Sequence, residues 1–581
     1  MSFVSRFVVS ASLISLLGLT ACSGTQTSNT GQSPTTTDDT TLLKLLYWQA
    51  PTILNPHLST GFKDWEASRI TLEPLATFNE NSELIPILAA EIPSVENGGV
   101  AEDGLSVMWK LKSDVLWSDG EPFTAEDVAF TFEWASNPDT GATSLGIFEG
   151  VESVEIVDDF TVQVIFKDVT PAWFNVFVGS ESLILPQHHF EEYQGTEART
   201  APANLMPVGT GAYRVVEFKP GDVVVYEKNP NYREADSVGF ERIELKGGGD
   251  ATSAARAVLQ TGDADFAYNL QVESKILDEL SQGGQGEVVA SFGSLGERII
   301  VNFTDPNQET AEGERSSIEF PHPFLTDIKV REAIATAIDR DTIAEQLYGI
   351  TGKPSANFIV NPPELVSPNT SYEFNLEKAN TLLDEAGWVD SNGDGTRDKD
   401  GVEMNMVFQT SVNPLRQKTQ AIAKQNLREI GIDLELKSID ASVFFSGDPA
   451  NADTTERFVA DLQMFTTGNT NPDPMPYLKR YTCDQMPTMA NNWTGDNYAR
   501  YCNPEYDALW AETNKELDSE KRQAAIIEMN DLLVNNVVVI PLVHRAETAG
   551  VSNSLSGVSL TPWDMNTWNI AEWKKVSEAA E

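Results

Sequence analysis

The sequence predicts an α/β fold with more than one domain. In the first half, an Ala-rich helix over 250–260 is followed by a short strand over 264–268. In the second half, a helix capped by Asn413 ends at Gly431, and alternating apolar residues over 432–436 predict a strand directly after it. This succession of helix and strand is typical of α/β lobes. A chain of 581 residues is also too long for a single hydrophobic core.

Short periodic patterns predict the elements of the first half in order. A strand over 42–48 opens the folded part of the chain, and apolar residues at helical spacing over 65–72 predict a helix before Pro74. Alternating apolar residues over 107–111 predict the next strand. Thr124 then begins a helix, because an acidic residue at the third helical position comes close to a capping box. Further strands are predicted within 151–166 and as a hairpin of 213–218 with 223–228.

In the second half, apolar residues at helical spacing predict a helix over 329–338. Five apolar residues form one stripe along it, so one face is expected to pack against a core: Val330, Ala333, Ile334, Ala337 and Ile338. A second helical segment over 342–348 follows and ends at Gly349. Taken in chain order, these elements suggest lobes that interleave along the sequence instead of following one another.

The N-terminal residues predict an exported, lipid-anchored protein. Arg6 precedes an apolar run over 7–19, which is too short to span a bilayer and has the length of a signal-peptide core. The Leu-Thr-Ala-Cys tetrad at 19–22 resembles the lipobox of bacterial lipoproteins, in which the Cys is acylated and becomes the new N-terminus. We therefore expect a signal peptide over 1–21 and lipidation of Cys22. An ordinary secretory signal with an incidental Cys is the alternative.

Residues 22–41 predict a flexible tether between the membrane and the folded part. They are mostly Ser, Thr, Gly, Gln, Asn and Asp, without an aromatic residue, so they bury too little apolar surface to order themselves. Beyond them, no apolar run approaches the ~20 residues that a transmembrane helix needs. We expect a large body facing the periplasm or the cell exterior, held at the membrane through the lipid anchor only.

The chain is strongly acidic, with 87 Asp and Glu against 40 Lys and Arg and a net charge of −47. Nucleic acid is excluded as a partner, because phosphate binding needs a basic patch and none is present in the sequence. The acidity could attract a cationic ligand or serve solubility, for example in a saline habitat. We favour solubility, because the charge is spread along the whole chain.

Only two Cys residues remain besides Cys22, namely Cys483 and Cys502. In an exported protein we expect this pair to form a disulfide. A bridge across this ~20-residue loop would stabilise the fold by about 3 kcal/mol on the chain-entropy model. Two buried thiols are the alternative. A metal site is disfavoured, because no His lies near either Cys in the sequence.

Recognisable catalytic motifs are absent from the sequence. It contains no Walker A loop, no Gly-x-Ser-x-Gly elbow and no His-Glu-x-x-His. The adjacent pair His188 and His189 is expected to point in different directions and to make a poor metal pair. We therefore expect no enzymatic activity and no required cofactor.

One loop has the spacing of a calcium site. Residues with oxygen ligands occupy positions 1, 3, 5, 7 and 9 of an EF-hand-like loop, with Gly at position 6: Asp390, Asn392, Asp394, Thr396 and Asp398. Gly401 stands at position 12 in place of the bidentate Glu, which excludes a complete EF-hand. A weaker structural calcium site and a metal-free turn rich in Asp and Asn remain equal alternatives.

Four segments in a consistent order resemble one protein family. They are Ser-Asp-Gly-Glu-Pro-Phe-Thr-Ala-Glu-Asp-Val at 118–128, the stretch with Gly-Thr-Gly-Ala-Tyr over 207–232, the helix over 329–340, and the helix and strand over 426–436. Together they resemble the solute-binding family 5 lipoproteins of ABC importers, which include oligopeptide, dipeptide and nickel binders. The resemblance runs from about 42 to about 569.

The resemblance implies a two-lobed periplasmic-binding-protein fold of type II (cluster C) with an additional subdomain inserted in the first lobe. Lobe I is expected to comprise 42–84, 208–297 and 541–575, the inserted subdomain 85–207, and lobe II 298–540. The ligand would lie in the cleft between the lobes and be enclosed by hinge closure. A monomer is expected.

The function implied by the resemblance is that of the extracytoplasmic solute-binding subunit of an ABC importer. Such a subunit captures peptides or a peptide-like solute and delivers them to a permease that works with ATPase subunits. Three alternatives remain open. The protein could be a peptide-sensing lipoprotein that presents its ligand to a receptor, a binder of a chelated metal or an oligosaccharide, or an exported hydrolase.

The resemblance also suggests ligand-binding residues. In peptide-binding relatives an Asp of the second lobe pairs with the peptide α-ammonium, and here the comparable stretch 466–474 has Gly468 or Asn469 in that place. A neutral side chain would forfeit roughly 1.5–3 kcal/mol of charge-assisted bonding. Asp473 is a candidate substitute, although a turn before Pro474 is its favoured role. Three Trp residues are predicted as cleft walls, with burial in the core as the alternative: Trp48, Trp493 and Trp563.

Overall fold

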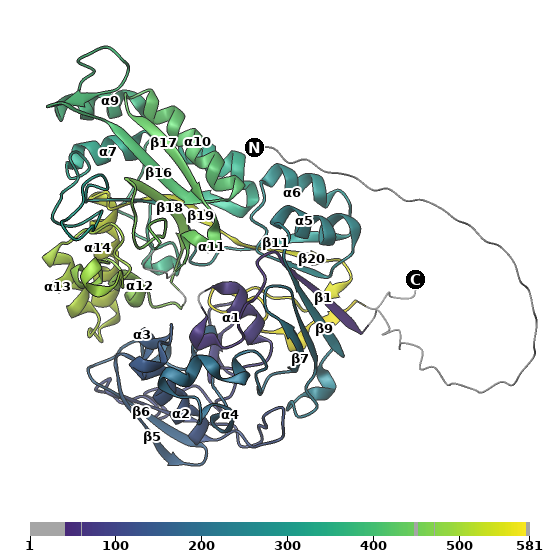
Figure 1. Cartoon of the computed structure of the whole chain (residues 1–581). Helices are drawn as coiled ribbons and strands as arrows, with labels where there is room; N and C mark the ends of the chain where they lie inside the picture. Colours follow the sequence, from purple (N-terminus) through teal and green to yellow (C-terminus); the bar gives the residue numbers. More distant parts are fainter. Residues whose placement is uncertain (1–40, 60, 447–450, 470, 577–581) are drawn as a thin grey trace, which may run out of the picture. The chain divides into compact units, whose positions relative to one another are not determined.

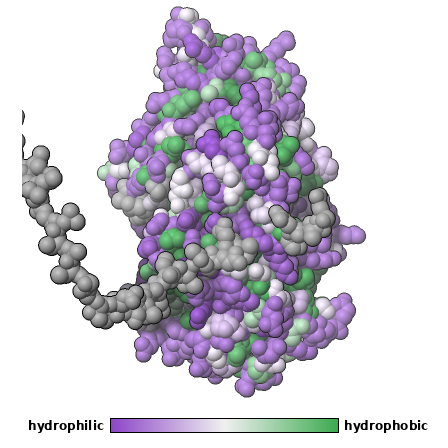
Figure 2. Space-filling model, turned by 90° about the vertical axis from the view of Figure 1, so that its right-hand side faces the viewer, coloured by the Kyte–Doolittle hydropathy of each residue, from purple (hydrophilic) through white to green (hydrophobic). Residues whose placement is uncertain are grey.

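The computed structural model describes residues 41–59, 61–446, 451–469 and 471–576 (Figure 1). The expected signal peptide, Cys22 with its expected lipidation, and all but the end of the expected tether lie outside these residues. Within the described ranges, no helix combines the length and the apolar character that crossing a bilayer requires. Hydrophilic residues cover most of the face in Figure 2, and hydrophobic residues are scattered over it.

A seven-stranded sheet forms the centre of lobe I. Its central strand β1 (Leu42–Tyr47) runs parallel to both of its neighbours, β9 and β10. The alternating burial of β1 places Leu43, Leu45 and Tyr47 in the core. The strands lie in the order β11 (Gly286–Ser291), β20 (Glu547–Ser552), β10 (Phe266–Tyr268), β1, β9 (Arg242–Gly247), β8 (Val223–Lys228) and β7 (Tyr213–Lys219). The predicted hairpin is confirmed by the pairing of β7 with β8.

A six-stranded sheet forms the centre of lobe II. Its strands lie in the order β13 (Gly352–Pro354), β19 (Val539–Arg545), β12 (Gly296–Val301), β18 (Leu462–Thr467), β16 (Asn405–Ser411) and β17 (Asp433–Ile439). Figure 1 shows α10 (Pro414–Arg428) beside β16 and β17, with α9 (Leu376–Glu385) and α7 (Ile328–Thr336) in the same lobe. The Asn413 cap predicted for α10 is confirmed, because its side chain accepts from the amides of Leu415 and Arg416.

The chain passes between the two sheets twice. Residues 292–295 join β11 to β12, and Ala546 alone separates β19 from β20. The expected boundaries at 297/298 and 540/541 are therefore wrong in detail, since they fall inside β12 and β19. Both strands belong entirely to the six-stranded sheet. The apolar residues of β12 and β19 continue through the expected boundaries, so no turn or polar segment in the sequence marks either lobe boundary.

The inserted subdomain has its own small sheet. Its strands lie in the order β4 (Ser106–Lys110), β6 (Thr161–Phe166) and β5 (Val151–Asp158), all antiparallel, and α2 (Ala125–Ser136) packs against them. The predicted capping box at the start of α2 is confirmed, with Thr124 and Asp127 exchanging hydrogen bonds. A separate hydrophobic cluster centred on Trp109, Trp117 and Trp134 fills the subdomain.

Further helices and strands complete the described fold. The helices are α1 (Phe62–Arg69), α3 (Leu145–Phe148), α4 (Gln187–Phe190), α5 (Ala251–Arg256), α6 (Ser274–Ser281), α8 (Arg340–Ile343), α11 (Ala441–Phe444), α12 (Met475–Lys479), α13 (Pro504–Thr513) and α14 (Ser519–Asn535). The remaining strands are β2 (Ala76–Phe78), β3 (Leu84–Pro86), β14 (Asp398–Lys399), β15 (Val402–Glu403), β21 (Leu555–Ser556) and β22 (Lys574–Lys575). A disulfide joins Cys483 to Cys502 between α12 and α13.

Candidate functional site

A cavity of about 580 Å³ lies between the inserted subdomain and lobe II. Residues within 143–181 form one side and residues within 468–514 the other, while Phe78 and Trp563 complete the wall. This volume is within the range of roughly 300–1,000 Å³ typical of small-ligand sites. Among the described residues that line it, none is His or Cys.

Ion pairs connect the two sides of this cavity. Lys479 Nζ lies 2.9 Å from Glu149 Oε2, and both residues line the cavity. Lys515 Nζ lies 3.0 Å from Asp168 Oδ1 and makes a second connection between lobe II and the subdomain. All four side chains are at least one-third exposed, so each pair contributes about 0–1 kcal/mol. Such weak links permit a cleft to open and close.

The helix α12 presents an aromatic and a cationic side chain to the cavity. Tyr477 and Arg480 are three residues apart, and the Arg480 guanidinium lies 5.4 Å from the centre of the Tyr477 ring. Arg480 Nε is 3.5 Å from Asp496 Oδ2. Burial lowers the pKa of Arg480, but the charge of Asp496 together with Tyr498, Tyr477 and Glu181 outweighs this effect and raises the pKa. Neither Tyr477 nor Arg480 was predicted from the sequence, although their i, i+3 spacing after Asp473-Pro474 was a usable signal.

Gly468 and Asn469 occupy the place where the resemblance implies an Asp. A Cβ atom at Gly468 would lie 2.4 Å from the backbone oxygen of Ser294, in the segment that joins the two sheets. That close approach requires glycine, so an acidic side chain has no room at 468. Asn469 follows it, lines the cavity and is 5% exposed.

Asn469, which lines the cavity, carries a buried acceptor without a hydrogen-bond partner. Its Nδ2 donates to the backbone oxygens of Asn471 (2.8 Å) and Asn361 (3.3 Å). Because both partners can only accept, the Oδ1 atom must face the other way, and it is buried without a hydrogen-bond partner. An unsatisfied buried acceptor costs roughly 1–3 kcal/mol. A ligand with an N–H group would remove that cost.

Asp473 lines the cavity but is committed to local structure. Its Oδ1 accepts from the amide of Met475 at the start of α12, and its Oδ2 pairs with Arg522. The favoured prediction for Asp473, a turn before Pro474, agrees with these contacts. Both carboxylate oxygens already have donors, so Asp473 is a poorer candidate for ligand binding than Asn469.

Of the three predicted Trp walls, only Trp563 lines the cavity. It is 3% exposed, and its Nε1 donates to Ser82 Oγ at 2.8 Å. Neither Trp48 nor Trp493 is among the residues that line this cavity, so their place in the cleft stays a prediction. Trp48 donates to Asn269 O at the end of the β1 strand, and the Arg457 guanidinium covers Trp493 at 4.1 Å. Sequence spacing did not reveal which face of each Trp would meet the cleft.

The 390–398 loop is a tight, exposed turn in which Asp side chains accept hydrogen bonds from backbone amides. Asp390 Oδ1 accepts from the amides of Gly393 and Asp394, and its Oδ2 accepts from Gly395. Asp398 accepts from the amide and hydroxyl of Ser391. These contacts explain the loop conformation without an ion. The calcium site at Asp390, Asn392, Asp394, Thr396 and Asp398 stays a prediction.

Residues 83–487 match the family described as "Bacterial extracellular solute-binding proteins, family 5 Middle". This chain belongs to the family 5 solute-binding proteins. The oligopeptide-binding protein AppA of Bacillus subtilis is 25% identical over 579 residues, which cover 97% of this chain and 98% of AppA. The similarity inferred from four sequence segments is thereby confirmed.

Solved family 5 structures share the fold. NikZ of Campylobacter jejuni in complex with Ni(L-His) has a TM-score of 0.76 and 24% identity, covering 92% of this chain and 100% of NikZ. AppA of Bacillus subtilis in complex with a nonapeptide has a TM-score of 0.74 and 23% identity, covering 92% and 99%. The predicted two-lobed α/β fold of the type II binding proteins is confirmed.

Proposed function

We propose that this family 5 protein is the extracytoplasmic solute-binding subunit of an ABC importer and captures peptides in the cavity between the subdomain and lobe II. The relative AppA is named for oligopeptide binding, and its solved structure holds a nonapeptide. Peptide backbones carry many N–H donors, which suit the unpaired Asn469 acceptor. Closure of the lobes would hold the peptide until a permease with ATPase subunits receives it.

The observation that carries the proposal is the combination of cavity and polar groups. A space of about 580 Å³ is bordered by aromatic rings and by charged side chains of both signs: Tyr477, Trp510, Lys479, Arg480, Glu149 and Asp496. Aromatic walls with a few fixed polar groups are typical of ligand pockets. We also propose that the protein is not an enzyme, because the family that it matches is one of solute-binding proteins.

Native mass spectrometry of the purified protein tests this function directly. We expect bound peptides that dissociate under denaturing conditions, and their sequences would report the length that the cavity accepts. Incubation of those peptides with the protein should leave them intact. A protein that carries a non-peptide mass, or that cleaves the peptides, would contradict the proposal.

Asn469→Ala is expected to weaken the binding of a captured peptide about tenfold, because the buried Oδ1 acceptor is lost. If Oδ1 accepts from the peptide ammonium, N-acetylation of the peptide weakens binding to the wild type but changes little for the variant. Isothermal titration calorimetry of the four combinations measures this. The matched control is Asn514→Ala, another cavity-lining Asn. Equal affinity of wild type and Asn469→Ala would disprove the role of Oδ1.

We also propose that Cys22 is lipidated, so that the exported protein is tethered to the cell membrane and acts as a monomer. The signal-peptide core and the lipobox-like tetrad at 19–22 support this. Labelling with a radioactive fatty acid should mark the wild type but not Cys22→Ser, which would be released from the membrane fraction.

A further inference from the structure

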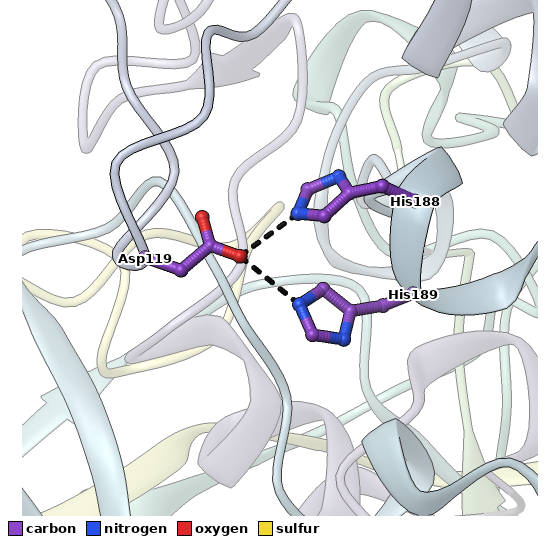
Figure 3. A group of neighbouring side chains, drawn as sticks. All are labelled: Asp119, His188 and His189. Atoms are coloured by element: carbon purple, nitrogen blue, oxygen red, sulfur yellow. Dashed lines mark hydrogen bonds and ion pairs between the residues drawn. The ribbon is translucent and has the colours of Figure 1, made fainter.

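Three side chains of the inserted subdomain converge on the surface (Figure 3). His188 Nε2 lies 2.8 Å and His189 Nε2 lies 3.0 Å from the same oxygen, Oδ2 of Asp119. The three possible ligand atoms all lie within 4.8 Å of one another. The expectation that the adjacent His side chains point apart is wrong, because both rings extend from α4 toward the turn that carries Asp119.

Buried contacts hold the two halves of this cluster in place. Asp127 is 5% exposed, and its Oδ1 accepts from the amide of Gln187, directly before His188. Its Oδ2 accepts from Trp117 Nε1, two residues before Asp119. One buried carboxylate thus connects both segments. Asp119 Oδ1 accepts from the amide of Glu121, which leaves Oδ2 to face the imidazoles.

We propose that Asp119, His188 and His189 bind one divalent transition-metal ion, with water in the remaining coordination positions. Imidazole nitrogen and carboxylate oxygen are suitable ligands for Zn²⁺, Ni²⁺ and Cu²⁺. Zn²⁺ holds such atoms at about 2.0–2.2 Å, so two ligands of one ion stand roughly 3–3.5 Å apart. The two N–O distances are already close to this. The remaining distance, between Nε2 of His188 and Nε2 of His189, can adjust by rotation of the imidazoles, because both rings are about one-third exposed.

Metal binding requires the other neutral tautomer of both imidazoles. A carboxylate at neutral pH only accepts, so both Nε2 atoms carry hydrogen in the metal-free arrangement. The metal takes the place of the two hydrogens at Oδ2, and each neutral imidazole then carries its hydrogen on Nδ1.

The metal site is separate from the peptide cavity. None of its three residues lines that cavity. Metal binding would join the turn of Asp119 to α4 and stabilise the subdomain, without a direct contact to the peptide. Peptide affinity and metal affinity are therefore expected to be independent, and failure of one proposal leaves the other intact.

Calorimetric titration of the purified, chelator-treated protein with Zn²⁺ tests the site. We expect one equivalent to bind, and His188→Gln and His189→Gln each to weaken binding more than about tenfold, since loss of even an outer-shell partner weakens metal sites 10–100-fold. Co²⁺ should produce visible absorption bands that disappear in both variants. Glu191→Gln, an exposed neighbour, is the control and should bind normally.

Circular dichroism confirms that each variant is folded, and peptide binding by each variant should equal that of the wild type. The proposal is overturned if the wild type binds no Zn²⁺. It is also overturned if both His variants bind as the wild type does, which would assign the ions to the acidic surface in general.

Discussion

Arg416→Met is expected to lower the free energy of unfolding by about 3–5 kcal/mol, because it leaves a buried carboxylate without its cation. Arg416, on α10, is 6% exposed, and Glu297, on β12, is 2% exposed. Arg416 Nε lies 2.8 Å from Glu297 Oε1. Arg416 Nη1 also donates to Ser411 Oγ at 2.8 Å, so the guanidinium joins α10 to the six-stranded sheet at two points.

The pKa of Glu297 should change with this substitution. Burial raises the pKa of Glu297, but the charge and hydrogen bonds of Arg416 outweigh burial and hold it below its ordinary value. Without Arg416 the pKa rises, so the destabilisation should be smaller at low pH, where Glu297 is protonated. Arg545 is a second nearby cation and limits the rise.

Urea unfolding of the wild type, Arg416→Met and the double variant Arg416→Met with Glu297→Gln measures this effect. The double variant should recover much of the lost stability, since the uncompensated Glu297 carboxylate is removed. If the free energy of unfolding of Arg416→Met lay within about 1 kcal/mol of the wild-type value, the stabilising role of the Arg416–Glu297 pair would be contradicted.

Raising the pH from about 5 to about 9 is expected to destabilise the protein by several kcal/mol, because one buried and one partly buried carboxyl group bind protons more tightly in the folded state. Burial raises the pKa of Glu66 to about 7, against opposing hydrogen bonds from Asn566, Tyr47 and Thr567. Burial and the charge of Glu66 raise the pKa of Glu547 to about 8, and Arg545 opposes the rise.

The direction of the pH effect follows from these pKa values. The ordinary pKa of both groups is 4.5, so between this value and about 7–8 the folded state is protonated while the unfolded state is ionised. Their contribution to stability is complete below the unfolded pKa. It is lost as the pH rises through about 7 for Glu66 and about 8 for Glu547. Each contributes on the order of 3–5 kcal/mol.

Glu547→Gln is expected to flatten this pH dependence and to make the protein more stable than the wild type at pH of about 9. Glu547 begins β20, directly after the single residue that joins the two lobe sheets. Thermal unfolding between pH of about 5 and 9 measures the effect. Glu287→Gln, an exposed carboxyl group on the neighbouring strand β11, is the matched control. If the stability of the wild type and of Glu547→Gln changed equally with pH, the raised pKa of Glu547 would be refuted.

Much of the local structure could be predicted from the sequence. The capping box of Thr124 and Asp127, the Asn413 cap and the β7–β8 hairpin depend on residues a few positions apart, and all three are present. The helix predicted over 250–260 forms as α5 followed by a wider helical turn that ends at Gly262. Short-range hydrogen bonds and periodic burial determine such features, so the amino-acid order suffices to predict them.

The candidate ligand site could be predicted only in part. Asn469, Asp473 and Trp563 line the cavity as the sequence suggested, whereas Trp48 and Trp493 do not. The opposite wall with Glu149 carries no motif, and it meets Lys479 across a separation of 330 residues. Contacts of this kind depend on how the lobes and the subdomain pack, which no local pattern records.

The sequence by itself determined the class of fold, the family and the one available pairing of Cys483 with Cys502, since these follow from periodicity, ordered motifs and counting. Only the tertiary structure decided where the chain passes between its two sheets, that Gly468 has no room for a side chain, and that His188 and His189 meet one carboxylate. Each of these depends on a distance between segments far apart in the chain, which packing sets and sequence spacing does not.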